Sequence, residues 1–320
     1  MHRPDARARI VLAVLAVLAA AAIVAFMTLG VRGNWGFVLG FRGTKVLGLI
    51  LVAWSIALST VLFQTVTGNR ILTPSIMGFD ALFILIRTGV TFFFGFGALA
   101  LMSPKVQFGA EVLVMTGFAV FLFQWLFLRA QRSLHLMVLV GIVFGVLFRN
   151  LAGFMQRLMD PVQFQTLQDM FFASFSRIDP TLLGVSTVIV GAASLVTWRI
   201  AHSFDVLMLG REQAISLGVP YRRRVATILA IVAVLVSVAT ALVGPVTFFG
   251  LLVVSLAHVL CGSGRHRHVL PAAVLLGIIC LVGGQTLLER VFAFDTALSI
   301  IIEFLGGLVF ILLLVRGAAR

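Results

Sequence analysis

The sequence is poor in charged residues. They make up 11% of its 320 residues, whereas hydrophobic residues make up 61%. An ordinary soluble domain carries about 25% charged residues, and a soluble chain of this length could not bury so large an apolar share. A membrane span needs about 20 mostly apolar residues, and this sequence contains many such runs, joined by short connections. The composition therefore predicts an all-α, multi-pass integral membrane protein.

Cysteine is also scarce, and the motifs of common enzymes are missing. Cys261 and Cys280 stand alone, without CxxC or Cys/His spacing, so the sequence predicts neither a disulfide framework nor a zinc site. It contains no HExxH, no GxSxG and no paired aspartates inside the apolar runs. We interpret the basic loop that holds His266 and His268 as a cytoplasmic anchor. These absences argue against a membrane-embedded enzyme.

A phosphate-binding loop is missing as well. The nearest glycine cluster, GFVLGFRGTK at 36–45, does not fit the GxxxxGK[ST] pattern that cradles nucleotide phosphates. If ATP drives this protein, a different chain must bind ATP and Mg²⁺. We therefore expect this chain to hold no catalytic residue, cofactor or metal of its own.

The apolar runs predict ten membrane spans in one transmembrane domain over residues 1–320. The first run extends to Leu29 and is longer than the apolar region of a signal peptide, which has about 7–15 residues. We therefore expect it to be a retained span, with a cleaved signal peptide as the alternative. The predicted spans are 10–29, 45–66, 79–100, 108–128, 134–154, 180–198, 225–243, 247–261, 269–288 and 297–315.

The basic residues indicate the topology. The net charge is +13 and comes almost entirely from arginine, which clusters in the connections between spans. Cytoplasmic loops carry an excess of Lys and Arg, and here the excess falls on the side of the N-terminus. We therefore expect both termini in the cytoplasm, contact with membrane lipid, and no nucleic-acid partner.

One polar stretch stands out between two apolar runs. It reads LMLGREQAISLGV at 207–219 and belongs to a predicted cytoplasmic segment at about 205–220. Glu212 falls in the first turn of the expected short helix, where a negative charge suits the helix dipole. Gly218 has the position of a helix-ending glycine. A short cytoplasmic helix between two spans is suited to docking another protein.

Three segments are not plain spans. The segments 64–78 and 244–250 are rich in helix-breaking residues, and 158–179 is amphipathic and expected at the outer surface. Irregular backbone at membrane depth is tolerated only where protein or a water-filled cavity satisfies it. The interrupted segments are therefore candidate elements of a transport pathway, although ordinary connecting loops explain them equally well.

Few ionisable side chains lie in the predicted spans, where charge is costly and functional by default. Asp80 and Arg87 share one helical face, so we expect them to pair structurally or to snorkel. Glu111 lies near a span end. Only Glu303 is an acid well inside a span, which leaves an ion-coupled secondary transporter as the weaker alternative.

Four pieces together resemble the FecCD-type permeases of type II ABC importers. The family's Arg-led second span and its bend resemble residues 42–78, and its cytoplasmic coupling segment resembles LMLGREQAISLGV. Its GPIGFVGLIVPH stretch resembles GPVTFFGLLVVSLAH at 244–258, and its last two spans resemble GSGRHRHVLP with LGGLVFILLL. This chain departs from the family at Arg70, which follows Asn69 where proline is frequent, and at Ala257, which precedes His258 where proline is frequent.

The resemblance implies the type II ABC importer permease fold and import across the bacterial cytoplasmic membrane. The expected cargo is an iron–siderophore complex, with heme or cobalamin as alternatives. The expected partners are a second permease subunit, two ATP-binding subunits and an extracytoplasmic substrate-binding protein. The two permeases are expected to differ, although a homodimer is the alternative.

The resemblance also implies three sets of site residues. Arg42, Lys45 and Arg290 would receive acidic residues of the binding protein, although Arg42 could be an interfacial anchor and Arg290 could pair with Glu289. The ATPase would be engaged through Ala214 and Leu217 as small and apolar contacts and through charges, the full set being Gly210, Arg211, Glu212, Ala214, Leu217 and Gly218. Residues beside the pathway would be Gln64, Asn69, Pro74, Gly244, Pro245, Phe248 and Gly250, for several of which helix packing is an equal explanation.

Overall fold

The computed structural model describes residues 3–31, 35–95, 102–123, 125, 134–175, 178–290 and 298–318, and all regular structure within these ranges is helical. Ten helical elements of the described residues overlap the ten predicted spans, although residues 96–100, 124, 126–128 and 297 of those spans lie outside the described residues. The elements are α1 (Arg3–Thr28), α2 (Trp35–Thr67), α3 (Phe79–Phe94), α5 (Pro104–Phe123), α6 (Leu134–Arg157), α8 (Pro180–Ile200), α11 (Tyr221–Val243), α12 (Phe249–Cys261), α13 (His266–Ile278) with its continuation, and α15 (Leu298–Ala318).

Shorter elements connect or extend these helices. Helix α13 continues through a π-helical turn, η4 (Ile279–Gly283), into α14 (Gly284–Arg290). The connecting elements are η1 (Pro74–Met77), α7 (Pro161–Asp169), η3 (Ala201–Ser203), α9 (Phe204–Leu207) and α10 (Arg211–Ser216). By length and composition, seven helical stretches can cross a membrane, and α12 and α15 are shorter apolar helices. The multi-pass helical architecture is therefore confirmed.

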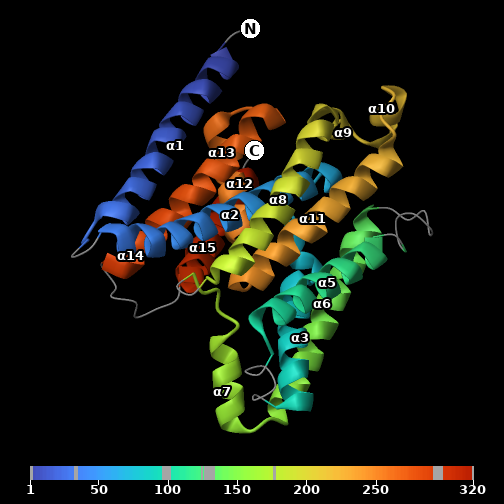
Figure 1. Cartoon of the computed structure of the whole chain (residues 1–320). Helices are drawn as coiled ribbons and strands as arrows, with labels where there is room; N and C mark the ends of the chain where they lie inside the picture. Colours follow the sequence, from blue (N-terminus) through green and yellow to red (C-terminus); the bar gives the residue numbers. More distant parts are fainter. Residues whose placement is uncertain are drawn as a thin grey trace.

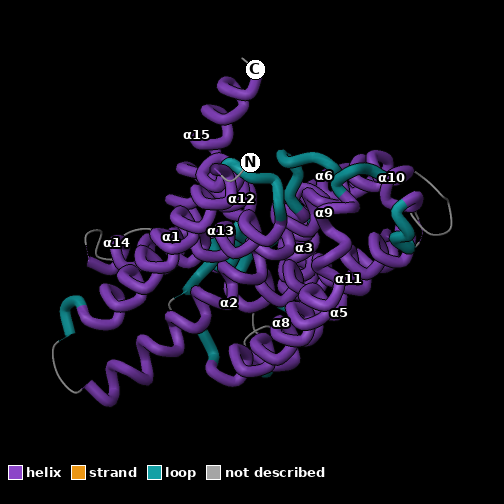
Figure 2. Tube along the Cα trace, turned by 90° about the horizontal axis from the view of Figure 1, so that it is seen from above, coloured by secondary structure: helices purple, strands orange, loops and turns teal. Residues whose placement is uncertain are grey.

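Helices α2 and α11 form the centre of the bundle. They pack against each other, and 72% of the most apolar window of each is buried, against 17% for α1. Leu58 and Phe63 of α2 belong to an apolar core shared with α3, α5, α6 and α11. Leu49 and Val52 of the same helix belong to a second core with α1, α12 and α13. Figures 1 and 2 show α2 passing between these two groups of helices, so α2 connects them.

Two glycines allow the bend after α2 to touch α6. Gly78 lies between η1 and α3 with φ 91°, a left-handed conformation that favours glycine. A Cβ atom at Gly78 would lie 2.8 Å from the Cα atom of Gly145 in α6. Any larger residue at either position would push these backbones apart.

Aspartates begin the helices on either side of the amphipathic segment 158–179. Asp160 Oδ1 accepts from Val162 N (2.9 Å) at the start of α7, and Asp179 Oδ1 accepts from Thr181 N (2.7 Å) at the start of α8. Both are side-chain N-caps. The backbone N–H groups of Thr181 and Leu182 hold the pKa of Asp179 below its ordinary value.

The expected pairing of Asp80 with Arg87 is wrong. Arg87 instead makes a two-pronged contact with Glu111 of α5, with Nε–Oε1 at 2.9 Å and Nη2–Oε2 at 3.4 Å. Gln107 Nε2 donates to the same carboxylate at 3.3 Å, and the Arg87 guanidinium lies 4.5 Å from the Phe83 ring centroid. Although Asp80 and Arg87 share a face of α3, Arg87 pairs with Glu111, because the carboxylate of Glu111 on the neighbouring helix α5 lies within hydrogen-bond distance.

This ion pair makes a prediction about stability. Arg87→Leu leaves the Glu111 carboxylate buried without its cation, which should lower the free energy of unfolding by about 3–5 kcal/mol. The double variant Arg87→Leu/Glu111→Leu removes both charges and should be markedly more stable than the single variant. Denaturant unfolding in detergent micelles measures both. A double variant no more stable than Arg87→Leu would contradict the role of the buried charge.

Candidate functional site

The predicted coupling segment forms a short helical knob between α8 and α11, at the upper right of Figure 1. Gly210 precedes α10 with φ 100° and ψ 170°, a conformation essentially restricted to glycine. After α10, Gly218 adopts φ 82°. Its N–H donates to Ile215 O (2.9 Å), and Val219 N donates to Ala214 O (3.0 Å). This is a Schellman cap, so the predicted short helix and its terminal glycine are confirmed.

The knob presents a mixed surface and keeps one residue inside. Arg211 and Glu212 are exposed, and Ile215 and Leu217 are 52% and 63% exposed. Ala214 is 0% exposed and belongs to the apolar core with Val219 packed against it. The expectation that Ala214 touches a partner therefore needs correction. Its small side chain lets α10 pack onto the chain itself.

The three basic residues predicted for binding-protein docking gather around the C-terminal end of α1. Arg42 Nη1 donates to the carbonyls of Phe26 (2.9 Å), Met27 (3.2 Å) and Leu29 (2.9 Å). Arg290 Nη2 also donates to Leu29 O, at 2.6 Å. The last carbonyls of a helix lack intrahelical partners and favour cations. Both arginines therefore cap α1, and each keeps further N–H groups of its guanidinium.

Lys45 is less available than the two arginines. It is 8% exposed, and its Nζ lies 3.4 Å from Glu289 Oε1. Gln285 Nε2 donates to the same oxygen at 3.1 Å. Glu289 therefore contacts Lys45, whereas Arg290 donates to Leu29 O at the end of α1, so the structure does not show the alternative of a local Arg290–Glu289 pair. Figure 1 places α14, which ends at Arg290, and α10 at opposite ends of the molecule.

The first interrupted segment is braced by its own side chains. Gln64 Nε2 donates to Arg70 O at 2.7 Å, and Asn69 Oδ1 accepts from Ile71 N at 3.0 Å. Pro74 is buried and opens η1. These bonds show that Gln64 and Asn69 shape the bend, and Gln64 also lines a cavity that faces the coupling end.

The second interrupted segment separates α11 from α12. Gly244 has φ 102° and ψ 174°, and a Cβ there would lie 3.1 Å from Ala173 Cα. Ser174 N donates to Val243 O at 2.8 Å, which satisfies the carbonyl that the break exposes. Beyond Pro245, Phe248 is the N-cap residue of α12 and lies against Gly306 of α15.

Gly250 brings α12 directly against α2. A Cβ at this position would overlap the side chain of Thr60 and lie 3.2 Å from Ile56 Cγ2. The glycine therefore permits a close helix approach where the second break meets the central helix.

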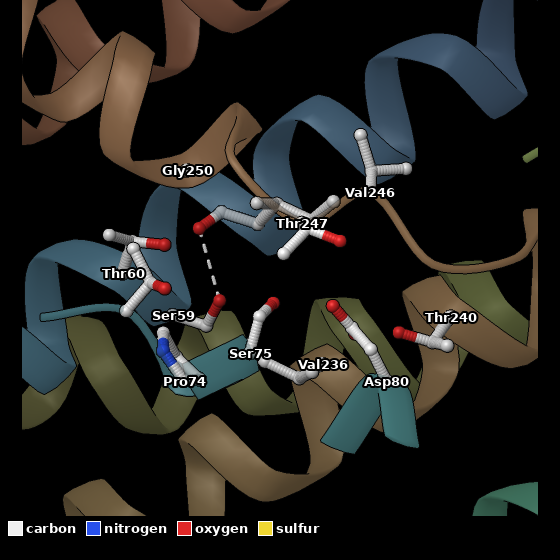
Figure 3. A pocket seen from close by; sticks show the side chains of 12 residues that line it. Ser59, Thr60, Pro74, Ser75, Asp80, Val236, Thr240, Val246, Thr247 and Gly250 are labelled. Carbon is white, nitrogen blue, oxygen red and sulfur yellow. Dashed lines mark hydrogen bonds between the residues drawn. The ribbon is translucent and has the colours of Figure 1, made fainter. Parts of the chain in front are cut away.

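The two breaks meet at a small polar cavity (Figure 3). Its polar lining includes hydroxyls from α2, η1, α11 and the second break, and the carboxyl group of Asp80 at the start of α3. Asp80 is 8% exposed and interacts with Ser75 and Thr247, but its Oδ2 has no hydrogen-bond partner among the described residues. The cavity holds about 10 Å³, roughly the space of one water molecule. It can accommodate water but not a bulky chelate.

A second cavity of about 80 Å³ lies at the coupling end, lined by Gln64, Thr65, Arg70, Met208, His258 and His266 among others. Beside it, His266 bridges Thr65 and Asp205. Reasoning from the sequence missed this group, since its members are 201 and 61 residues apart. It also missed the hydroxyl cavity around Asp80, for which the serines and threonines inside apolar runs were the available signal.

The described residues offer no obvious metal centre. No group of three or more His, Cys, Asp or Glu side chains among them is arranged to hold a metal ion. Cys261 and Cys280 are free thiols. The arrangement consists of the short helical knob α10 at one end, a capped helix end at the other, and two helix breaks.

Comparison with known proteins decides the family. The FecCD transport family matches residues 10–316. The chain belongs to this family. It is therefore a permease subunit of an ABC importer, which replaces the secondary-transporter alternative.

Individual relatives of this FecCD permease agree. It is 46% identical to the petrobactin import system permease protein YclO of Bacillus subtilis, over 89% of this chain and 90% of that protein. It is 34% identical to the petrobactin import system permease protein FatC of Bacillus anthracis, over 87% and 78%. A solved ABC transporter chain of the metal-chelate type superposes with a TM-score of 0.83 at 20% identity, covering 97% of this chain and 99% of that one. This last likeness confirms the permease fold.

Proposed function

We propose that this FecCD permease imports a ferric siderophore of the petrobactin class. The observation that carries the proposal is the 46% identity to a petrobactin permease across nearly the whole of both chains. Permeases named for hemin and for vitamin B12 are much less similar, at 26% and 24–28%. The cargo is the iron complex itself, which this chain releases and does not retain.

The second permease subunit is proposed to be a different chain. Bacillus anthracis has two petrobactin permeases, FatC and FatD, and this chain is 34% identical to the first and 26% identical to the second. This inequality supports a heterodimer in which the present chain takes the FatC-like place. The two helix breaks with Pro74 and Pro245 are the proposed pathway elements, since irregular backbone at membrane depth is kept where it borders a cavity or another chain.

The ATP-binding subunits are proposed to dock on α10. The sequence lacks a phosphate-binding loop, so nucleotide must be bound elsewhere. The knob exposes Ile215 and Leu217 beside Arg211 and Glu212, which suits insertion of an apolar face into a groove with charged rims. Gly210 and Gly218 fix the orientation of the knob through their backbone conformations.

The extracytoplasmic binding protein is proposed to dock at the capped end of α1. Arg290 is exposed and Arg42 is partly exposed, whereas Lys45 is buried. An arginine that caps a helix end is held in place, and its remaining donors can take a carboxylate in the forked geometry that arginine favours. Arg290 is therefore the main docking residue of the three. With α10 at the opposite end, this arrangement supports a cytoplasmic N-terminus.

The transport prediction uses the complete importer. The chain is reconstituted in proteoliposomes with the proposed second permease, ATPase and binding protein. ATP should drive uptake of ferric petrobactin, and excess hemin or cobalamin should not compete. Uptake that continues without the ATPase but requires an ion gradient would refute the importer assignment. Competition by hemin or cobalamin would refute the cargo.

A second prediction concerns docking of the binding protein. Arg290→Glu places a like charge opposite the proposed carboxylate and should weaken binding about tenfold, roughly 1.4 kcal/mol. Arg157→Glu makes the same charge change at an exposed site on the end of α6 and should have little effect. Binding is measured by biolayer interferometry at low salt. Equal affinity in the two variants would contradict the docking role.

A third prediction concerns the knob. Leu217→Asp should abolish co-purification with the ATPase, because it places a charge in the proposed apolar contact. Gly218→Val should destabilise the helix cap by about 1–2 kcal/mol, since a β-branched residue is strained at positive φ. It should therefore uncouple uptake from ATP hydrolysis. Gly218→Asn tolerates that conformation and serves as the control. Normal uptake in both Leu217→Asp and Gly218→Val would exclude α10 as the ATPase contact.

A further inference from the structure

His266 joins three elements beside the knob through contacts on every polar atom of its ring. Its Nδ1 lies 2.6 Å from Asp205 Oδ1 in α9, and its Nε2 lies 2.6 Å from Thr65 Oγ1 in α2. The ring also meets Phe204 edge-on, with centroids 5.5 Å apart. His266 itself is the first residue of α13 and is 8% exposed. One buried ring therefore contacts α9, α2 and α13.

One hydrogen-bond direction at the ring follows from its partner. A carboxylate can only accept, so Nδ1 donates to Asp205. Thr65 Oγ1 also lies 2.7 Å from Val61 O, so the hydroxyl contacts both the backbone of α2 and Nε2 of the ring.

Asp205 holds α13 in a second way. Its Oδ1 also accepts from the backbone N–H of His266, at 3.1 Å. A carboxylate at this place caps the first turn of α13 from another element. Its negative charge also interacts favourably with the positive end of the helix dipole. Displacing α9 would therefore disturb both the ring and the first turn of α13.

The carboxylate end of this contact is close to the proposed ATPase contact. Only residues 208–210 separate α9 from α10, and Gly210 N donates to Leu207 O at 3.1 Å. Figure 1 shows α9 and α10 side by side. Because this connection is short and hydrogen-bonded, a displacement of α10 should also displace α9.

The surroundings permit movement. The Asp205 side chain is 55% exposed, so water can replace its partner when the contact opens. The 80 Å³ cavity borders Thr65 and His266 on one side. The charged or titratable groups near the ring are Arg70 and His258 in the cavity lining and Arg265 next to it in the chain. These features fit a contact that forms and breaks.

We propose that Asp205, His266 and Thr65 form a latch that transmits displacement of α10 to α2 and α13. This inference rests on the proposed docking of the ATPase at α10. In it, His266 and Thr65 are positioning residues that touch neither nucleotide nor cargo. Helix α2 carries the displacement into the two cores that it connects. A histidine that merely fills space would need no hydroxyl at position 65, and this difference makes the latch testable.

The transport arm compares Thr65→Val with Thr65→Ser in the reconstituted importer. Valine keeps the volume of threonine but removes the hydroxyl, whereas serine keeps the hydroxyl. Ferric petrobactin taken up per ATP hydrolysed should fall about tenfold in Thr65→Val, within the range of measured coupling between sites. Thr65→Ser should stay near the unmodified chain. Equal ratios in Thr65→Val and the unmodified chain, or an equal loss in both variants, would overturn the latch.

A distance arm requires no transport. Spin labels are placed at Ser216→Cys on α10 and at Val259→Cys on the exposed face of α12, with both native cysteines replaced by alanine. Pulsed electron paramagnetic resonance on the chain in nanodiscs should give a narrow distance distribution that broadens with His266→Gln and with Thr65→Val. Unchanged distributions in both would overturn the latch. Failure of the unmodified importer to transport would refute the proposed function alone, since the distance arm is read independently.

Discussion

The structure depends on the requirement that every backbone polar group inside a membrane has a partner. The first break meets it with one of its own side chains, and the second meets it with a backbone group from elsewhere in the chain. Gln64 Nε2 donates a hydrogen bond to Arg70 O at the first break, and Ser174 N donates one to Val243 O at the second. Pro74 and Pro245 reduce the number of donors to be satisfied. Because the two breaks then share the small cavity at Asp80, neither can shift without altering the lining of the other.

Helix α2 connects the two helix breaks with both ends of the molecule. Its 33 residues correspond to about 50 Å of rigid helix. Near its start, Arg42 holds the end of α1 and Lys45 holds α14. Further along, Thr60 lies against Gly250 at the second break. Near its end, Thr65 meets His266. One continuous helix therefore contacts the proposed docking end, the breaks and the coupling end.

Apolar runs and glycines predicted the architecture and the knob, because hydrophobic length and backbone conformation are local properties. The multi-pass helical architecture, both breaks and the cap at Gly218 follow from such signals. Partner choice is not local. Arg87 selected Glu111 on another helix instead of Asp80 on its own, Ala214 turned inward although it sits in a polar stretch, and His266 reached residues 61 and 201 positions away. Only the packing of helices against one another decides these contacts.

Polar contacts in this chain differ in their access to water, and this difference separates fixed parts from parts able to move. The Arg87–Glu111 pair is buried, with the Glu111 side chain 3% exposed, and opening it would strand a charge in a low-dielectric interior. Together with the Gly78–Gly145 contact, it makes α3, α5 and α6 one rigid group. Asp205 and Arg290 are exposed to water, so their contacts can open at small cost. The contacts that open at small cost thus lie at the two proposed docking ends, where partners arrive and leave, and the fixed ones lie within the group of α3, α5 and α6.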